Sequence, residues 1–133
     1  MEKQQTSAAV AAFVRYTQAF QSLDPRAVAQ HFNEPAITIT PDGVVALPTA
    51  AAVEQVYQRL MADLPAKGYA RTELSPLVER RLGEDLAVVS GVGVWKNASG
   101  EELMRFGMTF TLRRAGGPWR IVVAAIHDPA AKG

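Results

Sequence analysis

The sequence predicts an α+β fold in which helices cover one face of an antiparallel sheet. Apolar residues recur at helical spacing in the first half of the chain, whereas the second half reads as a series of long strands. Helices placed before a run of strands are typical of the α+β class. The length of 133 residues corresponds to a single domain, and its core is expected from about residue 8 to residue 128.

The first helix is expected from Ala8 to Leu23, with Thr6 or Ser7 as its cap. Tyr16 lies just past the middle of this helix, where a side chain can point from the helical layer into a pocket walled by the sheet. The apolar stripe has the three- and four-residue spacing of one helical face. It contains Ala9, Val10, Phe13, Tyr16, Thr17 and Phe20.

A short second helix is expected over Pro25–Phe32. Asp24 supplies a capping carboxylate, and the proline that follows it suits the first helical position, where a missing N–H costs nothing. Asn33-Glu34-Pro35 is expected to end this helix. Two strands, Ala36–Thr40 and Val44–Leu47, then flank a Pro-Asp-Gly turn.

The third helix begins at Pro48-Thr49 and has the clearest helical stripe in the chain, formed by Val53, Val56, Tyr57, Leu60, Met61 and Leu64. Strands are expected to fill the rest of the sequence: Arg71–Arg81 with an interruption at Pro76, Leu86–Lys96, Leu103–Arg114, and Trp119 to Ile126 or His127.

Two of these strands are apolar on both faces. Leu86–Val89 and Ile121–Ile126 carry apolar residues at consecutive positions, which indicates that both sides of the sheet are covered. The helices cover only one side. We therefore expect a homodimer that forms through the outer sheet face. The alternative is a monomer with an aliphatic outer face.

Composition narrows the range of functions. Hydrophobic residues make up 48% and charged residues 20% of the chain, and the net charge of +1 gives no electrostatic reason to expect nucleic acid or a membrane as a partner. The chain has no cysteine and only two histidines, so a metal is not expected. No other cofactor is expected either, because Gly91-Val92-Gly93 lacks the third spaced glycine of a dinucleotide-binding loop. The start lacks a secretory pattern, and we expect a cytoplasmic protein.

The order of the elements resembles the nuclear transport factor 2-like superfamily, which includes ketosteroid isomerases and SnoaL-like polyketide cyclases. Three stretches carry the resemblance most clearly: Phe13–Tyr16, Leu23–Pro25 and His31–Ala36. It extends over nearly the whole chain, from about residue 8 to residue 128. The resemblance implies a cone-shaped fold, with three N-terminal helices packed on a strongly curved antiparallel sheet.

The same resemblance implies roles for individual residues. Tyr16 matches the tyrosine that donates to the substrate oxyanion in the isomerases, and Tyr57 matches the tyrosine that hydrogen-bonds to it. The general-base aspartate of the isomerases falls at Thr40, and their second oxyanion donor falls at Met108. A positioned base contributes ~10²–10⁴-fold to the rate, and a threonine hydroxyl is no resting base near neutral pH. Ketosteroid isomerase activity is therefore not expected.

His127 is the main acid–base candidate because it ends the last strand at the same parity as Ile121, Val123 and Ala125. The alternative places it in a frayed terminus outside the pocket. In the strands, Gly91 and Gly93 share a face with Trp95, an arrangement that could leave room for a ligand. The expected pocket is lined by Tyr16, Phe20, Thr40, Tyr57, Leu60, Trp95, Phe106, Met108, Phe110 and His127.

Two functions follow from these patterns. The first is a domain that binds a small, mostly hydrophobic molecule with a carbonyl or hydroxyl group; if it is catalytic, cofactor-free proton transfer would use Tyr16 as donor and His127 as base. The second is a non-catalytic dimeric interaction module, in which Tyr16 packs against Met108 and Trp95 and fills the cavity.

Overall fold

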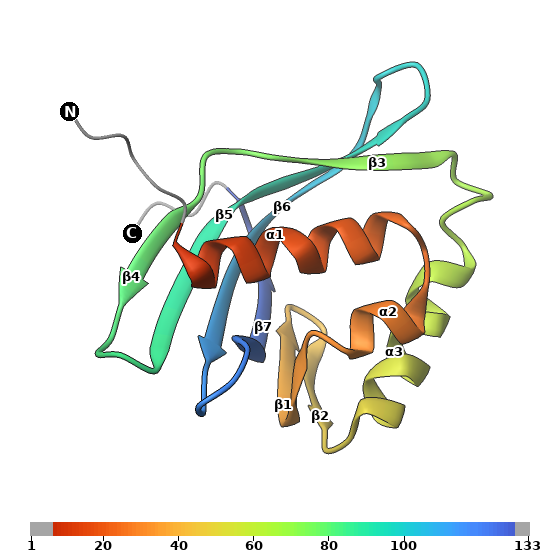
Figure 1. The fold of residues 1–133 in the computed structure, drawn as a ribbon. Coiled ribbons are helices and arrows are strands. Elements are labelled where there is room, and N and C mark those ends of the chain that lie inside the picture. The colour runs from red at the N-terminus through yellow and green to blue at the C-terminus, as the bar shows by residue number, and fades with distance from the viewer. Residues whose placement is uncertain (1–6, 130–133) are drawn as a thin grey trace.

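The computed structural model describes residues 7–129. Three helices and a curved, unclosed sheet form the domain (Figure 1). The helices are α1 (Ala8–Gln21), α2 (Pro25–Ala29) and α3 (Ala50–Ala62). The strands are β1 (Phe32–Thr40), β2 (Gly43–Leu47), β3 (Tyr69–Leu74), β4 (Val78–Arg81), β5 (Leu86–Asn97), β6 (Glu102–Arg113) and β7 (Arg120–His127).

Within the described residues, seven strands form one sheet in the order β2-β1-β7-β6-β5-β3, and β4 also pairs with β5. Figure 1 shows α1 lying across the concave face of this sheet, with α2 and α3 beside the β1–β2 hairpin. Helices and sheet together confirm the predicted cone-shaped α+β fold. In the described part of the chain, no helix is long and apolar enough to cross a membrane.

Capping residues set where the helices begin. The Ser7 hydroxyl accepts a hydrogen bond from the Val10 N–H at 3.0 Å, and the Asp24 carboxylate accepts from the first N–H groups of α2. Helix α2 ends at Ala29, earlier than predicted, because Phe32 already belongs to β1. The Ile121 N–H donates to the His31 carbonyl oxygen at 2.8 Å, which joins the start of β1 to β7.

One pairing in the sheet is parallel, although the sequence predicted an antiparallel sheet. Strand β1 runs parallel to β7, with Ile37 opposite Val123 and Ile39 opposite Ala125. The two strands are far apart in sequence, so no tight turn forces them to run in opposite directions. The interruption predicted at Pro76 is present, since β3 and β4 lie on either side of it and both pair with β5.

A bulge in β7 changes which side chains face inward. Leu112 of β6 lies opposite Ile121, but the next residue back, Thr111, lies opposite Val123, so Val122 has no partner across this pair. An extra residue reverses the alternation of side chains beyond it. Ala124 is consequently buried and Ile126 faces the interior, while His127 points from the outer face.

The core lies between α1 and the inner face of β5, β6 and β7. Phe110 of β6 is fully buried, and its ring meets that of Phe13 edge to face at a centroid distance of 5.1 Å. The ring of Tyr16 lies 5.4 Å from that of Phe110. Aromatic packing therefore fixes where α1 crosses the sheet and, with it, the direction of Tyr16.

A candidate ligand-binding site

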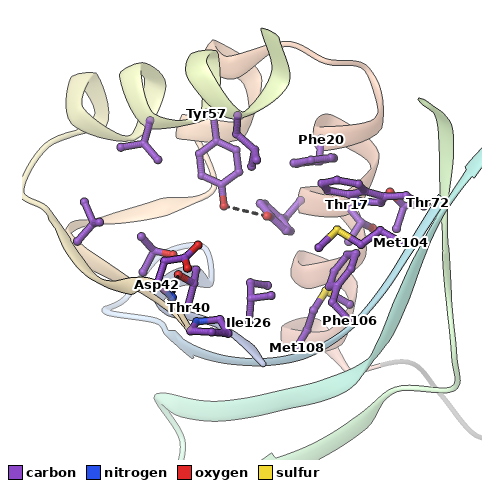
Figure 2. Close-up of a pocket in the computed structure, with 17 residues that line it drawn as sticks. Thr17, Phe20, Thr40, Asp42, Tyr57, Thr72, Met104, Phe106, Met108 and Ile126 are labelled. Carbon is purple, nitrogen blue, oxygen red and sulfur yellow. Dashed lines mark hydrogen bonds between the residues drawn. The ribbon is translucent and has the colours of Figure 1, made fainter. Parts of the chain in front are cut away.

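A cavity of about 490 Å³ lies between α1, α3, the β1–β2 hairpin and the inner face of β5 and β6 (Figure 2). Its volume is in the range of small-molecule sites in proteins. Most of its lining is apolar or aromatic, and the polar groups are hydroxyls and one carboxylate. The lining residues are Tyr16, Thr17, Phe20, Thr38, Thr40, Pro41, Asp42, Val45, Val56, Tyr57, Leu60, Thr72, Trp95, Met104, Phe106, Met108 and Ile126.

Two tyrosine hydroxyls meet in this cavity. The Tyr16 and Tyr57 oxygens are 2.9 Å apart, joined by the hydrogen bond drawn in Figure 2, and each residue is only 6% exposed. Tyr16 comes from α1 and Tyr57 from α3. The Tyr57 ring packs edge to face against Phe20 at a centroid distance of 6.1 Å. Because both rings are held by neighbours, the pair is positioned before any ligand arrives.

Burial makes both hydroxyls harder to ionise. It raises the pKa of Tyr16 well above the ordinary value, and the adjacent Tyr57 raises it further. Burial also raises the pKa of Tyr57 to about 12, although the hydrogen bond between Tyr57 and Tyr16 opposes part of that rise. One of the two tyrosine hydroxyls donates its hydrogen to the other. The second hydroxyl can therefore donate its own hydrogen to an acceptor in the cavity, such as a carbonyl oxygen.

Aromatic rings form the wall beside the pair. Phe20 of α1 stacks on Trp95 of β5 at a centroid distance of 5.8 Å, and Trp95 meets Phe106 of β6 edge to face at 5.5 Å. Gly91 and Gly93, which share a face with Trp95, could have left room for a ligand. They do not, because neighbouring side chains occupy that space. A Cβ at Gly93 would lie 2.9 Å from Phe106 ring atoms, and one at Gly91 would lie 2.7 Å from the Leu77 side chain.

Replacing Gly93 by alanine is expected to destabilise the fold by about 1–3 kcal/mol, because the added methyl group collides with the Phe106 ring. Equilibrium unfolding in urea measures this effect. Gly117→Ala is the matched control, since a Cβ there meets nothing within 4 Å. A Gly93→Ala protein as stable as the Gly117→Ala protein would contradict the close contact between Gly93 and Phe106.

The mouth of the cavity combines apolar and polar groups. Val45, Leu60 and Met104 line the cavity and are also 44–48% exposed, so they form an apolar rim. The side chains of Thr40 and Asp42 lie on the side of the cavity opposite Met104 and Phe106 (Figure 2). A ligand that enters the cavity therefore passes the apolar rim and the Asp42 carboxylate before it reaches the tyrosine pair.

Most of the residues predicted for the pocket line this cavity. They are Tyr16, Phe20, Thr40, Tyr57, Leu60, Trp95, Phe106 and Met108. Phe110 does not: it is fully buried below the cavity, between Phe13 and Tyr16. Its side chain points to the same inner face of the sheet as those of Phe106 and Met108. It lies further along β6, however, where α1 covers it.

His127 was predicted at the cavity and lies outside it. Its Nε2 is 2.8 Å from the Thr109 hydroxyl and its Nδ1 is 3.0 Å from the Asp128 carbonyl oxygen, on the outer face of the sheet. A Cβ added at Gly107 would overlap this imidazole, since it would lie 2.6 Å from Nδ1. The bulge at Val122 is the reason, because it reverses the parity on which the prediction was based. His127 cannot act as the base for a molecule in the cavity.

Several lining residues were not predicted from the sequence: Thr17, Thr38, Pro41, Asp42, Val45, Val56, Thr72, Met104 and Ile126. Thr38 could have been found, since it alternates with Thr40 on the same face of β1. Asp42 was considered only as a turn residue. In the described part of the chain, no group of three His, Cys, Asp or Glu side chains is placed to hold a metal ion.

The sequence matches a known family along almost its full length. Residues 5–129 match the family described as NTF2-like protein (DUF6841), where NTF2 stands for nuclear transport factor 2. The chain belongs to this NTF2-like family. The resemblance drawn from the order of the elements is thereby confirmed. Among curated proteins, none matches the sequence.

Solved structures of other proteins share the fold. An NTF2-like protein with a cystatin-like fold from Novosphingobium aromaticivorans has a TM-score of 0.75 and 20% identity, over 92% of this chain and 80% of that one. Aln2 from a Streptomyces species has a TM-score of 0.74 and 18% identity, over 96% and 94%. A putative calcium/calmodulin-dependent protein kinase II association domain from Xanthomonas campestris has 0.68 and 18%, over 98% and 99%. At these identities the likeness concerns the fold alone.

Proposed function

We propose that this NTF2-like protein binds a small, mostly hydrophobic molecule bearing a carbonyl or hydroxyl group. The observation that carries the proposal is the pair of buried, neutral tyrosine hydroxyls in a cavity of about 490 Å³ with otherwise largely apolar walls. Apolar walls favour a ligand that loses little hydration on entry, and a few convergent polar groups fix its orientation. The hydroxyl hydrogen that is not shared between Tyr16 and Tyr57 would be donated to the oxygen of the ligand.

If turnover accompanies binding, it is cofactor-free proton transfer in which the tyrosine pair polarises a carbonyl group. A hydroxyl held in a dry site stabilises the negative charge that develops on such an oxygen. The ketosteroid isomerase reaction is not part of this proposal. Thr40 and Met108 both line the cavity, and neither can act as the carboxyl group that the resemblance places there.

Binding of the proposed ligands is expected to depend on both tyrosines together. If only Tyr16 is changed to phenylalanine, the Tyr57 hydroxyl can still donate to the ligand. The double variant Tyr16→Phe/Tyr57→Phe removes both donors and is expected to weaken binding about two- to tenfold, the range for one neutral hydrogen bond. A panel of aromatic ketones, steroids and short acyl compounds tests this, with thermal stabilisation as the readout.

Ser22→Ala is the control, because it removes a hydroxyl that donates to the Ala19 carbonyl oxygen at the end of α1, and neither residue is part of the cavity lining. The control is expected to bind the panel as the wild type does. If no compound stabilises the wild type, or if the double variant binds equally well, the proposed role of the pair is wrong.

We also propose that the protein is a homodimer formed through the outer face of the sheet. Ile39 and Val44 lie opposite each other there, 38% and 63% exposed, and Ala125 neighbours Ile39 on β7. Their sequence neighbours Thr40, Val45 and Ile126 line the cavity, so these side chains point the other way. A second copy of the same face would cover this apolar surface.

The dimer is expected to dissociate when a charge is placed on this face. Light scattering should give twice the chain mass for the wild type and the chain mass for Ile39→Asp, because an unpaired carboxylate at an apolar interface is costly. Glu54→Gln on α3 is a control expected to stay dimeric. A monomeric wild type would contradict the proposal. A dimer that binds nothing in the panel would favour a non-catalytic interaction module, the second candidate function.

A further inference from the structure

Asp42 sets the charge of the cavity. Among the described residues that line the cavity, Asp42 alone carries a formal charge at neutral pH; the others are apolar, aromatic or hydroxyl-bearing. It lies in the turn between β1 and β2, where its own N–H donates to the Thr40 hydroxyl at 3.1 Å. This bond holds the turn against the end of β1, and Asp42 lies at the cavity in Figure 2.

The Asp42 carboxylate has no counter-ion within the described chain. The salt bridges of residues 7–129 are Arg71–Glu73, Lys96–Glu73, Arg105–Glu102 and Arg114–Asp85. Lysine, arginine and histidine are absent from the described cavity lining. A carboxylate at the mouth of an apolar cavity without a cation beside it is free to pair with a charge that the ligand brings.

The aromatic wall lies across the cavity from this carboxylate. Phe20, Trp95 and Phe106 form one side of the cavity, and Asp42 lies on the other. The rings offer an apolar surface to the body of a ligand. The carboxylate makes the mouth attractive to a cation and repulsive to an anion. A lone carboxylate does not hold a metal ion, which requires several ligands, so an organic cation is the better match.

We propose that the ligand is an apolar amine whose ammonium group pairs with Asp42 at the mouth. Its apolar body would lie against Phe20, Trp95 and Phe106, and its carbonyl or hydroxyl oxygen would meet the Tyr16–Tyr57 pair. This inference rests on the proposed function and adds the ligand's charge and a specificity-determining residue. Compounds of similar size with the same apolar body are therefore expected to bind differently according to their charge.

Three 2-acetylnaphthalenes test the inference because they share one apolar body and one carbonyl group for the tyrosine pair and differ only at position 6: 6-acetyl-2-naphthylmethylamine, 6-acetyl-2-naphthylmethanol and 6-acetyl-2-naphthoate. Calorimetry at low salt is expected to give an affinity for the amine about three- to tenfold above that for the alcohol, as for a charge-assisted contact that is partly solvated. The naphthoate is expected to bind most weakly. Raising the salt concentration should reduce the preference for the amine, since the contact lies at the mouth.

Two variants assign the effect to Asp42. Asp42→Asn is expected to abolish the difference between amine and alcohol and to improve the binding of the naphthoate. Asp63→Asn makes the same chemical change at the end of α3, away from the cavity lining, and should leave all three affinities unchanged. Circular dichroism checks that both variants are folded.

The outcomes separate this inference from the proposed function. If the compounds bind without preference for the amine, the ligand is not an amine. If the preference survives Asp42→Asn, Asp42 is not the residue that selects it. Either result overturns this inference, whereas the hydrophobic site stands. If none of the three compounds binds to the wild type at any salt concentration, both the amine and the proposed ligand site are wrong.

Discussion

Replacing Phe110 by alanine is expected to lower the free energy of unfolding by about 3–5 kcal/mol, the range for removing a large ring from a tightly packed core. Phe110 is fully buried and holds both Phe13 and Tyr16 in place through ring contacts at 5.1 Å and 5.4 Å. Urea unfolding followed by tryptophan fluorescence measures the change. The loss includes the space left beneath α1, which neighbouring side chains fill only in part.

Leu60→Ala is the comparison that gives this result its meaning. Leu60 lines the cavity at its rim and is 44% exposed, so its loss is expected to cost less than about 1 kcal/mol. The pair of variants distinguishes core from cavity wall. If the Phe110→Ala protein were as stable as the Leu60→Ala protein, the Phe110 ring would have to lie in the cavity wall. Its assignment to the core would then be wrong.

Stability is expected to fall steeply above pH 10, because the Tyr16–Tyr57 pair must stay neutral in the folded state. Burial raises the pKa of Tyr57 from 10.0 to about 12 and that of Tyr16 well above its ordinary value. A folded-state pKa above the unfolded value gives stability that is complete below pH 10 and is lost as the pH rises through the folded pKa. For Tyr57 alone this amounts to roughly 2–3 kcal/mol.

The free energy of unfolding, measured from pH 9 to pH 12 for the wild type and for Tyr16→Phe/Tyr57→Phe, tests this expectation. The double variant should lose much less stability over that interval, because phenylalanine does not ionise. Absorbance at alkaline pH gives a second readout, since the chain has only three tyrosines and burial also raises the pKa of Tyr69. Equal pH dependence of the two proteins would show that these hydroxyls are not buried.

The helices and the tyrosine pair could be predicted from sequence because their signals are local. The stripes of α1 and α3 place Tyr16 and Tyr57 on the faces that turn toward the sheet, and Asp24-Pro25 marks the start of α2. The second helix was predicted too long. Phe32 fits a helical pattern, but its place is decided by the pairing of β1 with β7, a contact between distant segments.

The inner and outer faces of β7 could not be assigned from the sequence. Alternation is a reliable guide only while every residue of a strand has a partner, and Val122 has none across β6. Nothing in the run from Ile121 to Ile126 marks this bulge. The error moved His127 into the cavity, although its imidazole lies on the outer face beside Thr109. A single inserted residue thus changed the predicted chemistry of the site.

The contribution of the β1–β2 turn was missed for a different reason. Pro-Asp-Gly predicts a turn, and turn residues are commonly solvated, so Asp42 was given no further role. It is the curvature of the sheet that brings the tip of this hairpin to the mouth of the cavity (Figure 2). The curvature of the sheet depends on all of its strands, so the sequence around Asp42 contains no local signal for it.

The most direct test of the central claim, that a neutral hydroxyl pair inside an apolar cavity receives the ligand, is a crystal structure with bound 2-acetylnaphthalene. This compound joins an apolar body to one carbonyl group and carries no charge. We predict that its rings lie beside Phe20 and Trp95 and that its oxygen lies within hydrogen-bonding distance of a Tyr16 or Tyr57 hydroxyl. A cavity left empty at saturating concentration, or a carbonyl turned toward the mouth with both hydroxyls unengaged, would contradict the claim.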